Sequence, residues 1–122
     1  MELLGYRKLV AYQRAKEIVK ITYKYIKLFP ADERHALSEQ LKRAAVSVTS
    51  NIAEGTSRFS IKDKSRFIEM AYGSLMELSS QFEIAEELRY ITSNDRLSID
   101  EKIIEESRLL SGLIKSYKQK NT

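Results

Sequence analysis

Ser50-Asn-Ile-Ala-Glu-Gly-Thr-Ser-Arg-Phe-Ser60 is the stretch that decides the fold, because it separates two long segments with helical periodicity. Before it, apolar residues recur at three- or four-residue steps, at Leu37, Leu41, Ala44, Val48 and Ile52. After it, the same steps connect Phe67, Ala71, Leu75, Leu78, Phe82, Ala85 and Leu88. Gly55 suits the left-handed residue just past a helix end, and Ser60 with Asp63 resembles a capping box. The pattern predicts helices over about 31–54 and 61–90, joined as a hairpin.

Outside this hairpin, two more segments have helical periodicity. The first predicted helix covers about 6–29 and ends at Pro30, since proline suits a first helical turn and not an interior. The fourth covers about 99–118 and begins after Ser98-Ile-Asp-Glu101, which fits a capping box. Short connections make consecutive helices antiparallel neighbours. Residues 1–122 are therefore predicted to form one all-α domain, an antiparallel up-down-up-down four-helix bundle.

The composition excludes several classes of protein. Four glycines and one proline cannot supply the turns of an all-β fold, and the absence of cysteine excludes disulfides and zinc–thiolate sites. The first residues contain no apolar run typical of a signal peptide, and no stretch approaches the ~18 apolar residues of a membrane span. We expect a cytoplasmic protein with no membrane association and no cofactor.

No group of residues meets the geometric requirements of catalysis. The single histidine, His35, has no glutamate three residues before it, so the paired Glu-x-x-His sites of carboxylate-bridged bundles are excluded. Gly55-Thr-Ser-Arg58 lacks the Gly-Lys-Ser/Thr of a phosphate-binding loop. The sequence therefore predicts neither a metal site nor catalytic residues, and we expect that the protein is not an enzyme.

The positive charge of the chain is concentrated in the first predicted helix. The net charge is +4, and residues 1–29 contain seven Lys/Arg against two Asp/Glu. Steps of four, four and three place one group of lysines on a single ridge, with Arg7, Lys8 and Arg14 adding charge toward the helix start: Lys16, Lys20, Lys24 and Lys27. Such a ridge can neutralise phosphates, or it can be an ordinary solvated face. Tyr23 and Tyr25 could stack on bases or pack against other helices.

A run of small residues, Ala44 to Glu54, lies inside the second predicted helix. Serine, threonine and asparagine are poor helix formers, so a packing gain must offset them. The run indicates either tight packing within the bundle or a subunit interface in which Arg43, Asn51 and Glu54 satisfy one another across helices. Some apolar residues fall outside the stripes and predict a partner surface: Tyr6, Val10, Ile18, Ile21, Tyr25, Ala45, Val46 and Met76.

Four motifs of this chain resemble, in order and spacing, a known bundle family. They begin at Leu28-Phe-Pro-Ala-Asp-Glu-Arg, Leu41-Lys-Arg-Ala-Ala-Val-Ser-Val, Ser50-Asn-Ile-Ala-Glu-Gly and Ala71-Tyr-Gly-Ser-Leu-Met-Glu-Leu. The family is named for proteins encoded in intervening sequences of bacterial large-subunit ribosomal RNA, and it includes accessory proteins of diversity-generating retroelements. The resemblance covers residues 6–91 and extends to the fourth helix only by pattern. Its motif positions include Arg43, Ser47, Asn51, Glu54, Gly55 and Arg58.

This resemblance implies a homo-oligomer, a pentameric barrel, and in retroelement members a basic surface that binds nucleic acid and a reverse transcriptase. Two functional hypotheses follow. The first is a non-enzymatic oligomeric scaffold that binds RNA or DNA without sequence specificity through Arg7, Arg14 and the four lysines. The second is a structural or protein–protein interaction module with no role in nucleic-acid binding.

Overall fold

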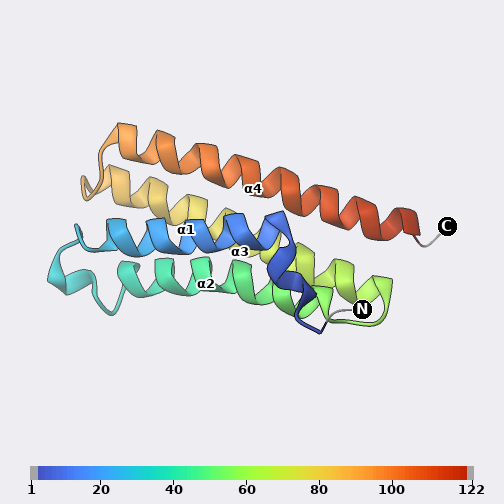
Figure 1. Cartoon of the computed structure of the whole chain (residues 1–122). Coiled ribbons are helices and arrows are strands. Elements are labelled where there is room, and N and C mark those ends of the chain that lie inside the picture. The colour runs from blue at the N-terminus through green and yellow to red at the C-terminus, as the bar shows by residue number, and fades with distance from the viewer. Residues whose placement is uncertain (1–2, 121–122) are drawn as a thin grey trace.

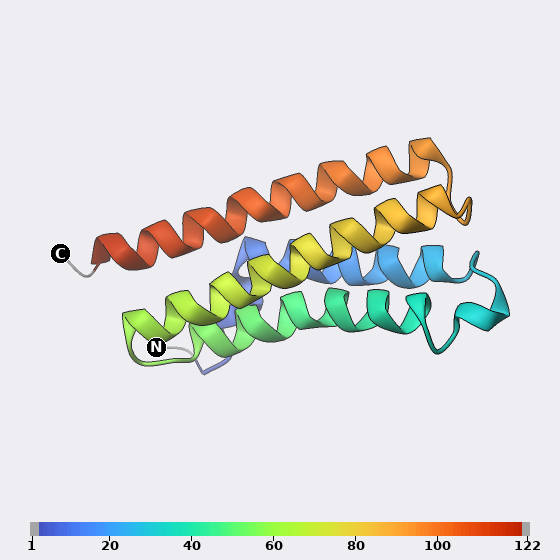
Figure 2. The same cartoon turned by 180° about the vertical axis from the view of Figure 1, so that it is seen from behind.

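The computed structural model describes residues 3–120 and contains four α-helices and two short 3₁₀ turns, with no strand among these residues. The elements, in chain order, are η1 (Gly5–Lys8), α1 (Val10–Ile26), η2 (Ala31–Glu33), α2 (Leu37–Thr56), α3 (Ile61–Glu87) and α4 (Ser93–Lys120). The α1–α2 and α3–α4 connections lie at one end of the bundle, and the α2–α3 connection lies at the other, near both chain termini (Figures 1 and 2). We call these the turn end and the tip end.

The first helix is shorter than the periodicity predicts. The chain is extended at Leu9, which separates η1 from α1, and α1 ends at Ile26, four residues before Pro30. Ala11, Ala15, Ile18 and Thr22 form its buried face. The interpretation of Ile18 as surplus apolar surface is therefore wrong, because the apolar face of α1 is wide enough to pack against both α2 and α4.

The second helix begins six residues later than predicted. Pro30 leads into η2, and the backbone at Ala36 (φ −124°, ψ −106°) then interrupts any continuous helix before Leu37. The Glu33 carboxylate accepts a hydrogen bond from the Leu37 amide (3.4 Å), so it satisfies one of the free donors at the start of α2. Ala45 is completely buried, so the prediction that it is surplus apolar surface is also wrong.

Gly55 does not have the predicted left-handed conformation. It lies inside α2, is buried, and has a negative φ. A Cβ placed on it would lie 2.9 Å from the Phe67 Cβ and 3.2 Å from the Lys64 carbonyl oxygen. The glycine is needed because it lets the end of α2 approach the beginning of α3.

The two ends of α3 are capped in different ways. The Ser60 hydroxyl accepts a hydrogen bond from the Asp63 amide (3.1 Å), which confirms the predicted N-cap. At the other end, Arg89 has a left-handed φ of 64°. The Arg89 and Tyr90 amides donate to the carbonyls of Glu86 (2.8 Å) and Ala85 (2.9 Å), the pair of bonds that defines a Schellman motif. The helix therefore ends at Glu87 and not at the predicted Tyr90.

The fourth helix begins at Ser93 and not at the predicted Ile99. The Thr92 hydroxyl accepts from the Asp95 amide and the Asp95 carboxylate accepts from the Thr92 amide, both at 3.0 Å. This reciprocal pair is the true capping box, and Ser98 is an exposed residue inside the helix. Asp95 also accepts a hydrogen bond from Tyr25 (3.4 Å), which ties the start of α4 to α1.

Further contacts close the turn end of the bundle. The Phe29 and Tyr90 rings lie 5.1 Å apart, and the Tyr90 hydroxyl donates to Glu33 (2.7 Å). That hydrogen bond, with a smaller effect of burial, raises the pKa of Tyr90 to about 12. Arg96 links Glu86 on α3 to Asp100 on α4. Polar groups contributed by all four helices and η2 therefore pair with one another at this end.

A carboxylate lies within the core at the middle of α4. Glu106 is completely buried, and neither of its oxygens has a hydrogen-bond partner among the described residues. Burial raises the pKa of Glu106 to about 8, with a smaller raising effect from Glu105 and a lowering effect from Arg14. The protonated form is therefore the one that suits this site, because an unpaired buried carboxylate costs several kcal/mol.

Candidate nucleic-acid interface

The lysine ridge consists of Lys16, Lys20, Lys24 and Lys27, and all four side chains are exposed. The first three lie on α1, and Lys27 is its C-cap residue. The opposite face of α1 is buried in the core through its alanines, Ile18 and Thr22, and this fixes the ridge toward solvent. Among the described residues, no carboxylate lies within ion-pair distance of these four ammonium groups. None of the four is therefore held in an ion pair among the described residues, although Lys24 lies close enough to Asp95 to help lower the pKa of its carboxyl.

An aromatic side chain lies within this ridge. Tyr23 is 42% exposed and shares a shallow groove of about 410 Å³ with Val19, Lys20, Lys24 and Lys27. The ammonium of Lys42, on α2, lies 5.5 Å from the centre of the Tyr23 ring. The sequence does not predict that Lys42 lies near the ridge, because Lys42 belongs to α2 and approaches α1 only when the two helices pack. An exposed ring between cations can stack on a base whose phosphates the cations hold.

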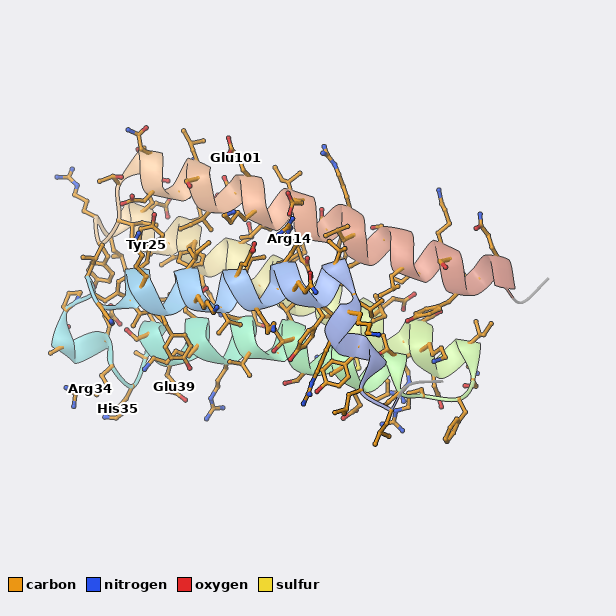
Figure 3. All side chains as sticks on the ribbon, in the orientation of Figure 1. Arg14, Tyr25, Arg34, His35, Glu39 and Glu101 are labelled. Carbon is orange, nitrogen blue, oxygen red and sulfur yellow. The ribbon has the colours of Figure 1, made fainter. Side chains whose placement is uncertain are left out.

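Tyr25 is not available for stacking on a base. It packs edge-on against Phe82, with 6.4 Å between ring centres, and its hydroxyl donates to Asp95 (3.4 Å). Burial raises the pKa of Tyr25, and the Asp95 carboxylate raises it further. Figure 3 shows Tyr25 at the level of the α1–α4 contact, which agrees with a packing role.

The two arginines predicted to extend the ridge lie apart from it. Arg14 forms ion pairs with Glu17 on its own helix and with Glu105 on α4, both at 3.1 Å, so its charge is offset (Figure 3). Arg7 lies on η1, where its guanidinium carbon is 5.8 Å from the centre of the Tyr6 ring. The continuous positive surface is therefore the four lysines and Lys42.

The motif residues of α2 form a second, neutral line of side chains. Ser47 is hydrogen-bonded to Ser74 on α3 (2.8 Å), and Asn51 donates to the Ser47 hydroxyl (3.0 Å) and carbonyl (2.9 Å). Arg43 pairs with Glu39 (3.0 Å), and Glu54 pairs with Arg58 (3.1 Å). Arg43, Asn51 and Glu54 are therefore each satisfied by a different partner, and no hydrogen bond or ion pair joins them within one chain.

Apolar residues remain exposed on the outer faces of α2 and α3. Val46 is 41% exposed and Met76 40% exposed, as the surplus apolar pattern predicts, and Met70 and Ile84 on α3 are similarly exposed. Gly73, on the same helix, has no atom within 4 Å of where its Cβ would be. Small and apolar residues together form a surface that another helix could approach closely.

The single histidine and the acidic side chains do not form a metal site among the described residues. His35 is exposed in the turn before α2, where Figure 3 shows it with Arg34 pointing away from the bundle. Residues 3–120 hold no cluster of three or more His, Asp and Glu side chains that could bind a metal ion. No helix among them is long and apolar enough to cross a membrane.

Comparisons with known proteins agree with this fold. The model of the family described as 23S rRNA-intervening sequence protein matches residues 7–112. A crystal structure of a protein of unknown function from the S23 ribosomal protein family of Bacteroides thetaiotaomicron VPI-5482 superimposes with a TM-score of 0.78. It shares 24% sequence identity and covers 87% of this chain and 99% of its own, a likeness that shows the fold alone. None of the curated proteins matches the chain.

Proposed function

This chain belongs to the family of 23S rRNA-intervening sequence proteins, and from that premise we propose that it is a non-enzymatic scaffold that binds RNA or DNA without sequence specificity. The observation that carries the proposal is the lysine ridge, whose four ammonium groups have no carboxylate partner among the described residues. Counterion release from phosphates gives such a surface affinity for any polynucleotide. Tyr23 adds a stacking surface within the ridge.

We also propose that the antiparallel bundle assembles into a homo-oligomer, the pentamer that the resemblance implies. Exposed Val46, Met70 and Met76, together with Gly73, support a contact between copies on the α2–α3 face. Assembly multiplies the field of each ridge, because several copies of a +4 chain add their charges over one surface. Light scattering should give a mass of about five times 14.1 kDa, whereas a monomer at micromolar concentration would contradict this part of the proposal.

A salt titration tests the nucleic-acid proposal. The Lys16/Lys20/Lys24/Lys27→Glu variant should lose at least about tenfold in affinity for a labelled RNA, and the slope of log K against log salt should decrease by about 3, because about 0.7 counterions are released per single-strand phosphate contact. The matched control is Arg34/Arg89/Lys102/Arg108→Glu, which changes the net charge equally at exposed positions outside the ridge. Equal losses in both variants would show that only net charge matters, and equal, weak binding by wild type and ridge variant would overturn the proposal.

The second candidate function is a protein-interaction module without a nucleic-acid role. The exposed apolar residues of α2 and α3 favour it independently of the lysines. If assembly is intact while RNA and DNA binding is absent for the wild-type chain, this candidate replaces the first.

A further inference from the structure

The tip end exposes an aromatic ring. Phe59 lies in the connection between α2 and α3 and is 103% exposed, as open to water as in an extended peptide. Burying a phenylalanine stabilises a fold by about 1.5–3 kcal/mol, so this residue contributes nothing comparable here. The neighbouring Phe67, in contrast, is buried.

A cationic groove lies beside this connection. It has a volume of about 450 Å³ and is lined by Ile61, Lys62, Ser65, Arg66 and Glu69 from α3 and by Lys118 from α4. Three cations thus face one acid. Ser65 is 7% exposed, and its hydroxyl has no hydrogen-bond partner among the described residues. A groove with several cations and an unused hydroxyl has the chemistry of a phosphate site.

The first turn of α3 adds to this positive potential. α3 has 27 residues, and its free amides and dipole favour an anion near Ser60. Arg66 and Arg58 lie over the Phe67 ring, with guanidinium carbons 4.7 Å and 4.4 Å from the ring centre. Stacking restricts both side chains, so less entropy is lost when a guanidinium binds a phosphate. Arg66 is only weakly paired to Asp63, at 3.8 Å.

A single exposed ring, placed three residues before Lys62 in the chain, fits an unpaired nucleotide better than it fits an apolar peptide, which would need a wider apolar surface. We propose that the tip, defined as Phe59, Lys62, Arg66 and Lys118, binds an unpaired segment of RNA or DNA. The Phe59 ring stacks on a base, and the groove holds an adjoining phosphate. This inference rests on the proposed function and adds to it a second contact and a preference for single strands over duplexes.

A tryptophan reporter tests the stacking contact directly. The chain contains no tryptophan, so Phe59→Trp creates a single fluorophore at the tip. We expect an unlabelled single-stranded oligouridine to quench this fluorescence and a duplex of the same length to leave it nearly unchanged. The matched control is Leu97→Trp, an exposed apolar position near the opposite end of the bundle, which should respond to neither.

Affinities give the second readout. Phe59→Ala should weaken single-strand binding by about 5- to 150-fold, the usual contribution of one base–aromatic stack, and should leave duplex binding unchanged. Phe59→Tyr should restore single-strand binding, and Leu97→Ala should alter nothing. Because both positions are exposed, all five variants at Phe59 and Leu97 should fold as the wild type does.

The outcomes separate the two proposals. If the ridge variant loses binding while Phe59→Ala binds single strands as the wild type does, the nucleic-acid function stands and the tip proposal is overturned. If the wild-type chain binds no nucleic acid, both are overturned. Equal quenching of Phe59→Trp by duplex and single strand would also overturn the stacking contact, because a paired base offers no free face.

Discussion

The two ends of the bundle differ in how their charges are satisfied. At the turn end, residues 83–101 hold six Asp/Glu and two Arg, and many of these groups pair with each other or with Tyr25, Ser93 and Thr92. At the tip end, residues 57–66 hold four Lys/Arg and one Asp, and residues 111–118 hold two Lys and no acid. Arg58 pairs with Glu54 and Arg66 weakly with Asp63, but cations outnumber acids in these two segments. The contrast teaches that paired charges hold the helices together at the turn end, whereas the tip end keeps an excess of positive charge.

Ionising Glu106 should have the largest effect on stability. Glu106 lies between the two ends of the bundle, eleven residues along α4 from Asp95 and eleven from Tyr117. Burial raises the pKa of Glu106 to about 8, so the folded chain keeps a proton that the unfolded chain releases above its ordinary value of 4.5. Stability should therefore fall as pH rises from about 5 to about 8.5, by up to about 4 kcal/mol, since each unit of pKa difference is worth about 1.4 kcal/mol.

Urea denaturation at the two pH values measures this change. The lowered pKa values of Glu86 and Asp95 act with the opposite sign and below this window, so they do not obscure it. Glu106→Gln should remove most of the pH dependence and should be more stable than the wild type at the higher pH. A wild-type chain whose stability stays constant across the window would show that Glu106 is paired or hydrated when charged.

Substituting Gly55 should loosen the tip end by a smaller amount. Gly55→Val places side-chain atoms against Phe67 and the Lys64 carbonyl, and overpacking of this kind costs about 1–3 kcal/mol. Gly112→Ala, on α4, is the matched control, because the space around that helical glycine is open and alanine should stabilise the helix by up to about 1 kcal/mol. Chemical denaturation of the pair gives the difference, and similar effects of both substitutions would contradict the close approach of α2 and α3.

The smallest effect concerns Arg89 at the turn end. Arg89→Gly should raise the free energy of unfolding by about 0.5–1 kcal/mol, because glycine adopts the left-handed conformation without the cost that an L side chain incurs. Arg89→Ala keeps that cost and should give no gain. Thermal unfolding of both variants tests this prediction. Equal melting temperatures would show that the left-handed conformation of residue 89 costs no measurable stability.

Periodicity was sufficient to predict four helices, the buried faces of α2 and α3, and the Ser60 cap, since these depend on residues close together in sequence. It was wrong about Gly55 and about the start of α4. The glycine at position 55 answers to the close approach of Phe67 on another helix, and the cap that forms is the reciprocal Thr92–Asp95 pair, a box as local as the one predicted at Ser98. Two apolar residues interpreted as surplus, Ile18 and Ala45, are buried because each of their helices has two helical neighbours.

In the candidate site, too, the features that depend on local sequence were predictable and those that depend on contacts between helices were not. The lysine ridge depends only on spacing within α1, so the sequence predicts its exposed positions. Lys42 near Tyr23, and Lys118 beside Lys62 and Arg66, come from different helices and share a surface only after folding. Arg14 shows the converse, since its ion pair with Glu105 on α4 could not be read from α1 alone.

The opposite charges at the two ends also give the folded chain an electric dipole moment along its long axis. In the field of a polyanion, the total charge of +4 gives a net attraction, and the dipole moment adds a torque. The torque favours encounters in which the tip end leads, and the lysine ridge on the side of α1 can contact the same polynucleotide afterwards. Phe59 would then arrive first, and the geometry of an encounter would be selected during diffusion, before any contact forms.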